Sequence, residues 1–144
     1  MCTCVETIQQ TYIGVKRQTE VIAEESFDMD SFLDKINSVK KKVVLVSNDI
    51  NSFVELVRQY FVELNTEDSL MLYNEFIVTR AKMFEVYANL RNSSVYVGMK
   101  TAVKDFRSSI DAFSEMCQDL QEFNIKLSEN VKFRELLKDL DDIA

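Results

Sequence analysis

Apolar residues recur at intervals of three and four along most of this chain, the spacing that places side chains on one face of an α-helix. The first such run predicts a helix over residues 3–25. Its stripe consists of Val5, Ile8, Tyr12, Val15, Thr19 and Ile22. No segment shows the sustained alternation of a half-buried strand. The pattern therefore predicts an all-α protein.

The longest uninterrupted stripe predicts a second helix over residues 31–64, about 50 Å long at ~1.5 Å per residue. Ser31, with Asp34 three residues later, approximates a capping box at its start. The stripe consists of Phe32, Ile36, Val39, Val43, Val46, Ile50, Phe53, Val57, Tyr60 and Leu64. A short β-branched run at residues 43–46 favours a strand locally, but the unbroken period on both sides outweighs it.

A third helix is predicted over residues 67–92, because Asn65 to Asp68 supply an N-cap candidate followed by acidic residues in the first turn. Its stripe consists of Tyr73, Phe76, Arg80, Met83, Tyr87 and Leu90, widened by Leu70, Ile77 and Phe84. A face this wide is typical of a helix that packs against several others.

After Asn92 to Ser94 the same spacing returns and predicts a fourth helix over residues 95–127. Its stripe consists of Met99, Val103, Phe106, Ile110, Phe113, Cys117, Leu120 and Leu127, with the polar Asn124 on the same face. A restart at Ser128 to Asn130 then predicts a short helical tail over residues 130–143. The tail carries Phe133, Leu136, Leu140 and Ile143 on one side.

Together these elements predict an antiparallel bundle of four long helices with a short C-terminal helical tail, in which the short connections make successive helices neighbours. The 144 residues, 47% of them apolar, suffice for one core, so we expect a single domain over residues 1–144. The second helix is longer than the first by roughly ten residues. We therefore expect part of its stripe to need another cover, either the tail or a second subunit.

Charge and cysteine content indicate the surroundings of the protein. A formal charge of −7 repels phosphate backbones, so duplex nucleic acid is a poor partner. No secretory signal and no apolar run of the length of a membrane span is found, which favours a cytoplasmic protein. Cys2, Cys4 and Cys117 are expected to be reduced thiols, because three cysteines cannot all pair and the first two lie very close in sequence.

The residues that usually carry catalysis are missing from this sequence. With no histidine, the chain lacks the common general base and the usual histidine-containing metal and nucleophile sites. No glycine-rich loop precedes a helix, so nucleotide binding is unsupported. We expect no enzyme activity, no catalytic residue, no cofactor and no metal site.

Val44, Leu45 and Arg80 are the interface candidates. Val44 and Leu45 lie off the main stripe of the second helix, beside the basic cluster Lys40 to Lys42. Arg80 interrupts the apolar stripe of the third helix, where a charge needs a partner or access to water.

The sequence therefore favours a non-enzymatic protein–protein interaction module, an adaptor, inhibitor or assembly subunit that acts through helix–helix contacts. Self-association through the second helix is the simplest form, with a heteromeric partner left open. The alternative is a peripheral membrane or lipid-binding helical protein, with Cys2 or Cys4 as acylation sites.

Overall fold

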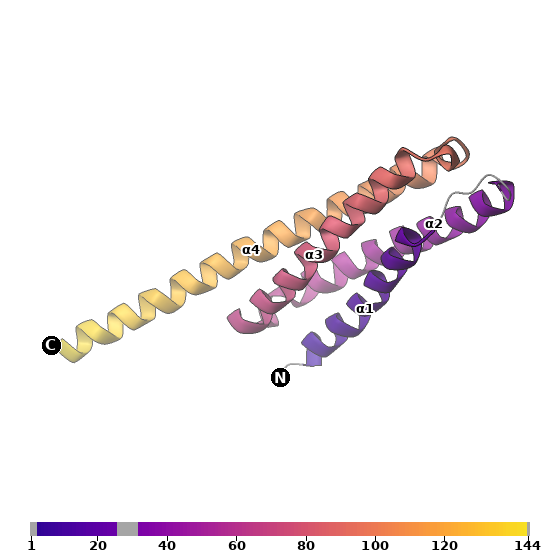
Figure 1. The fold of residues 1–144 in the computed structure, drawn as a ribbon. Coiled ribbons are helices and arrows are strands. Elements are labelled where there is room, and N and C mark those ends of the chain that lie inside the picture. The colour runs from indigo at the N-terminus through magenta and orange to yellow at the C-terminus, as the bar shows by residue number, and fades with distance from the viewer. Residues whose placement is uncertain (1–2, 26–31, 144) are drawn as a thin grey trace.

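The computed structural model describes residues 3–25 and 32–143, with the side chains of residues 3, 32–34, 127, 128, 130, 131 and 141–143 left aside. Its α-helices are α1 (Thr3–Ala23), α2 (Phe32–Tyr60), α3 (Thr66–Arg91) and α4 (Lys100–Ile143), joined in part by the 3-10 helices η2 (Phe61–Glu63) and η3 (Ser94–Gly98). Within these ranges there is no strand, and the predicted all-α bundle of four long helices is confirmed (Figure 1).

The C-terminal helical tail is continuous with α4, which runs without a break from Lys100 to Ile143. The restart expected at Ser128 to Asn130 does not interrupt it. Serine and asparagine are weak helix formers, but neither prevents a helix, and no proline or glycine follows to end it. The helix also begins later than expected, because residues Ser94–Gly98 form the 3-10 turn η3.

The start of α3 follows the sequence prediction. The Asn65 side chain accepts a hydrogen bond of 2.8 Å from the backbone N–H of Asp68, and Glu67 and Asp68 lie in the first turn. This bond satisfies one of the otherwise unpaired amides at a helix start. The capping box expected at Ser31 and Asp34 lies outside the residues and side chains described.

Successive helices run in opposite directions, but α2 and α3 are not side by side. The main packed pairs are α1 with α2, α3 with α4, α2 with α4, and α1 with α3. The pair α2 and α4 is parallel, because residues later in α2 contact residues later in α4. The contacts are Ser47 with Ser109, Phe53 with Phe113, and Arg58 with Asp119. The fold therefore consists of two antiparallel helical hairpins, α1–α2 and α3–α4, which pack so that the parallel helices α2 and α4 are neighbours. The expectation that all consecutive helices are neighbours is wrong for α2 and α3.

Each helix contributes one aromatic ring to the centre of the bundle. The ring of Phe76 lies 5.2 Å from Tyr12, 5.3 Å from Phe53 and 5.8 Å from Phe113, measured between centroids. The Tyr12 hydroxyl shares a hydrogen bond of 2.5 Å with Thr79 and donates one of 2.9 Å to the backbone carbonyl of Glu75. A buried tyrosine needs such partners. This cluster joins the diagonal helices α2 and α3 as well as the adjacent ones.

The predicted stripes of α1, α2 and α4 are confirmed as core wherever their side chains are described, except that Tyr60 is half-buried. The predicted stripe of α3 is confirmed at Phe76, Met83 and Leu90, but its other members lie at the edge of the core or outside it. The buried residues of α3 are Ser69, Leu72, Phe76, Thr79, Met83, Val86 and Leu90. The tyrosines that supported the other phase, Tyr73 and Tyr87, are half-buried at the edges of the core. A tyrosine fits such an edge, because its ring packs while its hydroxyl reaches water.

The stripe of α2 has no uncovered part among its described residues, so that expectation is wrong. Its residues from Ile36 to Val57 are buried, against α1 on one side and α4 on the other. At the N-terminal end of α2, the turn η3 supplies the cover. A Cβ atom at Gly98 would lie 3.0 Å from two carbons of the Ile36 side chain, so this close approach depends on a residue without a side chain.

Candidate interaction surfaces

The C-terminal part of α4 extends past the ends of the other helices (Figure 1). We call residues 125–143 the overhang. Every described side chain in the overhang is exposed, from Ile125 to Leu140. The preceding part of the same helix is packed against α2 and α3. One helix therefore has a covered region and an uncovered region.

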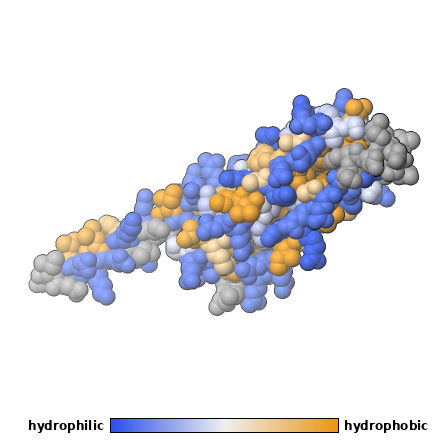
Figure 2. Space-filling view, in the orientation of Figure 1, coloured by the Kyte–Doolittle hydropathy of each residue, from blue (hydrophilic) through white to orange (hydrophobic). Residues whose placement is uncertain are grey.

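Large apolar side chains lie along one side of the overhang, and we call them the apolar stripe. Its members, with their exposed fractions, are Ile125 (53%), Phe133 (61%), Leu136 (56%), Leu137 (46%) and Leu140 (55%). Spacings of three, four and seven residues bring the last four onto one helix face. Figure 2 shows hydrophobic atoms along one edge of the overhang and hydrophilic atoms beside them.

The apolar stripe is out of phase with the core face of α4. That face passes through Phe113, Leu120 and Asn124. At about 100° per residue it continues through positions 127 and 131 and then through Glu135 and Lys138, so from residue 135 on it is charged. The stripe lies on roughly the opposite side. The stretch from Phe133 to Leu140 therefore does not prolong the bundle core but presents a separate surface.

A groove lies at the root of the overhang, between the start of α3 and α4. Its volume is about 410 Å³, and its lining residues are Leu70, Tyr73, Gln121, Asn124, Ile125, Glu129 and Lys132. Asn124 lies on the core face, as its spacing predicted, and is 7% exposed. Neither polar atom of its side-chain amide has a hydrogen-bond partner among the described residues. The groove thus combines exposed apolar side chains with an unpaired buried amide.

Val44 and Leu45 are 42% and 58% exposed on the outer side of α2. They form a small apolar patch near the basic cluster, in which Lys42 pairs with Glu25 while Lys40 and Lys41 are exposed. Two residues make a small surface, and single exposed apolar residues are common in folded proteins. The overhang carries the larger continuous apolar surface.

Arg80 lies at the edge of the α3 core rather than within it. Its side chain is half-buried, next to the buried Thr79 and one turn from Phe76 and Met83. The guanidinium lies close enough to Cys117 of α4 to lower the pKa of that thiol electrostatically. The corrected phase of α3 thus removes the apparent conflict of a charge in an apolar stripe.

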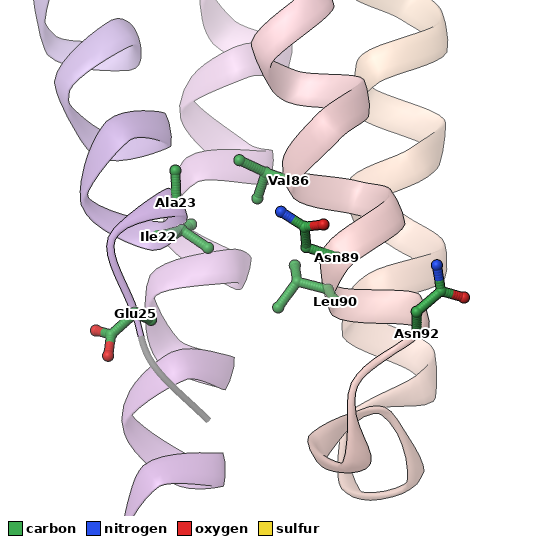
Figure 3. Close-up of a pocket in the computed structure, with 7 residues that line it drawn as sticks. All are labelled: Ile22, Ala23, Glu25, Val86, Asn89, Leu90 and Asn92. Atoms are coloured by element: carbon green, nitrogen blue, oxygen red, sulfur yellow. The ribbon is translucent and has the colours of Figure 1, made fainter. Parts of the chain in front are cut away.

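A pocket of about 320 Å³ lies between the end of α1 and the end of α3 (Figure 3). Ile22, Val86 and Leu90 supply its apolar walls, and Asn89 supplies an amide. Glu25 also lines the pocket, but its carboxylate is the one that pairs with Lys42. Among the described residues, no nucleophile lines the pocket next to a base.

Burial is the largest cause of the pKa shifts of Cys117 and Tyr12 in the bundle. Burial raises the pKa of the Cys117 thiol to about 12, against the smaller opposing effect of Arg80. Burial also raises the pKa of the Tyr12 hydroxyl, which the hydrogen bond with Thr79 partly offsets. A reactive cysteine needs a lowered pKa and access to solvent, so Cys117 is a packing residue.

Cys4 is buried and disulfide-bonded, so the expectation of a reduced thiol is wrong for this residue. Cys2 lies outside the described residues. Across the described helices, no segment is both long and apolar enough for a membrane crossing.

Comparison with family models, curated proteins and solved structures gives no match to this chain. The function must therefore be inferred from the surfaces of the molecule. The sequence identified Phe133, Leu136 and Leu140 as an amphipathic segment but not as an interface. The charged continuation of the α4 core face, at Glu135 and Lys138, is the pattern from which that interface could have been inferred.

Proposed function

We propose that this protein is a non-enzymatic interaction module whose binding element is the overhang of α4. The supporting observation is the apolar stripe, four of whose members, Phe133, Leu136, Leu137 and Leu140, form one compact helix face about half exposed to solvent. A contiguous apolar face of this kind marks an interaction site more often than scattered exposed residues do. An amphipathic helix meets its partner through anchors at this spacing.

The bundle serves as the rigid support in this proposal. The overhang shares an unbroken helix with the packed residues Lys100 to Asn124, so its direction is set by the bundle. A helix that is held in its bound conformation loses less conformational entropy on binding than a free peptide does. Val44, Leu45 and Arg80 remain secondary interface candidates within the same function.

Peripheral membrane attachment is the second candidate, and the same apolar stripe is the observation that favours it. Amphipathic helices that lie on membranes carry lysine and arginine on their polar face. The overhang has Lys132 and Arg134 but also Glu135 and Asp139. Mixed charges of this kind weaken attraction to anionic lipids.

A cytoplasmic location is also part of the proposal. The disulfide at Cys4 is more typical of oxidising compartments.

Binding of a partner tests the proposal directly. The full chain and its Leu136→Asp/Leu140→Asp variant would be crosslinked in the native host, and the captured proteins would be quantified. A second copy of the same chain counts as a captured partner. We expect that variant to lose the captured partner and the Val62→Asp variant to keep it. Val62 is the matched control because it is 83% exposed on η2, outside the overhang.

Two outcomes would contradict this proposal. If both variants captured the same proteins as the unaltered chain, the overhang would not be the binding element. In the other outcome, the unaltered chain floats with neutral vesicles, the Leu136→Asp/Leu140→Asp variant does not, and no protein is captured. Membrane attachment would then replace the interaction module as the proposed function. Circular dichroism of each variant confirms that the bundle is folded.

A further inference from the structure

We infer that the overhang binds the overhang of a second copy of this chain, with the two helices antiparallel about a two-fold axis between Leu136 and Leu137. The inference rests on the proposed function and names the partner. It concerns the apolar stripe and its flanking charges, not the patch at Val44 and Leu45.

The apolar stripe is self-complementary about that axis. Phe133 and Leu140 lie at equal distances on either side of it, and Leu136 and Leu137 lie next to it. In an antiparallel pair, each Phe133 therefore lies at the level of Leu140 of the second copy. The four leucines at positions 136 and 137 of the two copies close the centre. A two-fold interface requires this kind of self-complementarity, since the same residues form both sides.

The charges beside the stripe follow the same symmetry. Lys132 and Asp139 are seven residues apart and therefore lie on the same flank of the stripe. In antiparallel helix pairs, equivalent flanks of the two copies face each other, and flanking charges choose partner and direction. Lys132 of each copy then lies within about one helical turn, measured along the axis, of Asp139 of the other. Symmetry makes two such pairs.

A parallel pair lacks this complementarity. It would bring the flank with Lys132 against the other flank of the second copy, so Lys132 would lie near Arg134 of that copy, a like charge, and not near an acidic residue. Glu135 and Lys138 do not decide the direction, since they lie on the side of the helix away from the stripe. The order of charge along the flank, basic before acidic, therefore selects the antiparallel arrangement.

The bundle itself does not compete for the stripe. The overhang projects away from α1, α2 and α3 (Figure 1). By helical spacing, its stripe faces away from the core side of α4. The contact is short, about two and a half helical turns from Lys132 to Leu140, so we expect a weak, reversible dimer and not an obligate one.

Sedimentation equilibrium of the full chain over a dilution series tests the association. We expect a reversible monomer–dimer equilibrium. The Leu136→Asp/Leu140→Asp variant should lower the association constant by a factor of at least about ten. Val62→Asp is the folded control that should leave the equilibrium unchanged. Val44→Asp/Leu45→Asp tests the competing surface on α2, and dissociation by that variant alone would overturn the inference.

Charge reversal tests the direction of the helices. Lys132→Asp and Asp139→Lys should each weaken the dimer, because each creates two like-charge contacts across the axis. The double variant Lys132→Asp/Asp139→Lys should restore it at low salt. A parallel dimer predicts no such rescue, and equal weakening in the double variant would contradict the antiparallel arrangement.

A zero-length carbodiimide crosslink identifies the pair itself. In a mixture of ¹⁴N- and ¹⁵N-labelled protein, we expect a mixed-isotope peptide that joins Lys132 to Asp139. The two residues of one copy are separated by about 10 Å along the helix, too far for a direct amide bond. If the chain stayed monomeric at high concentration while the stripe variant still lost a captured protein of another sequence, the second-copy inference would be wrong and the interaction module would stand.

Discussion

The two parts of α4 have similar apolar spacing and opposite surroundings. Between Val103 and Leu120 the apolar residues are almost completely buried against α2 and α3, whereas from Phe133 to Leu140 they are about half exposed. No break in the helix separates them. The difference has two causes: the second part of α4 extends past the other helices (Figure 1), and its apolar residues lie on another side of the helix. Helical spacing thus predicts that a helix forms and leaves open what covers it.

The largest contrast is expected between two phenylalanines of α4. Phe113 is 0% exposed and belongs to the central aromatic cluster, while Phe133 is 61% exposed. Phe113→Ala should lower the free energy of unfolding by about 3–5 kcal/mol, because it leaves a cavity in the core. Phe133→Ala should change it by less than about 0.5 kcal/mol in dilute protein. Denaturant unfolding measures both, and similar losses at the two sites would mean that the overhang packs on its own bundle.

A second contrast concerns pH, because the packed part of α4 contains a buried thiol. In the unfolded chain a cysteine has a pKa of about 8.5, whereas in the folded protein burial raises the pKa of Cys117 to about 12. The folded state then binds the proton more tightly. The stabilisation is complete below about pH 8.5 and is lost towards pH 12, at up to about 1.4 kcal/mol per pH unit.

Unfolding of the Cys117→Ala variant tests this pH dependence. Between about pH 9 and pH 10, the free energy of unfolding of this variant should fall less steeply than that of the unaltered chain. The two slopes should differ by about 1 kcal/mol per pH unit. Phe133→Ala in the overhang should keep the steep slope. Parallel slopes for Cys117→Ala and the unaltered chain would show that the thiol ionises equally in both states.

The smallest effect is expected at the boundary between the two parts. Asn124 is buried there without a hydrogen-bond partner among the described residues. A buried amide without partners costs free energy, so Asn124→Leu should raise the stability of the bundle by about 1 kcal/mol. Gln121→Leu is the matched control on an exposed position of the same groove, with an expected change within about 0.5 kcal/mol. Destabilisation by Asn124→Leu would indicate that the amide is satisfied by water.

Most of the fold could be predicted from the sequence because helical period is a local property. The stripes of α1, α2 and α4 and the Asn65 cap follow from spacing and residue type alone. The phase of α3 could not, since Tyr73 and Tyr87 resemble core residues in sequence but lie at its edge. Nor could the pairing of helices, because the contact between α2 and α4 depends on residues far apart in the chain, such as Ser47 and Ser109.

The candidate site was predicted only in part. Val44 and Leu45 are exposed, as expected, but the uncovered stripe expected on α2 is covered by α4 and by the close packing of Ile36 on Gly98. The helix that extends beyond the bundle is α4, and its length depended on whether Ser128 to Asn130 ended the helix. Weak helix formers alone do not decide that, since neighbouring residues propagate the helix through them.

Amide hydrogen exchange along α4, recorded at several protein concentrations, tests the central claim most directly. In dilute protein we expect strong protection from Val103 to Leu120 and little from Phe133 to Leu140, because local opening costs least where no side chain is packed. Raising the concentration should protect the overhang alone, as the second copy covers it. Equal protection of both parts in dilute protein, or an overhang whose exchange is independent of concentration, would contradict this account.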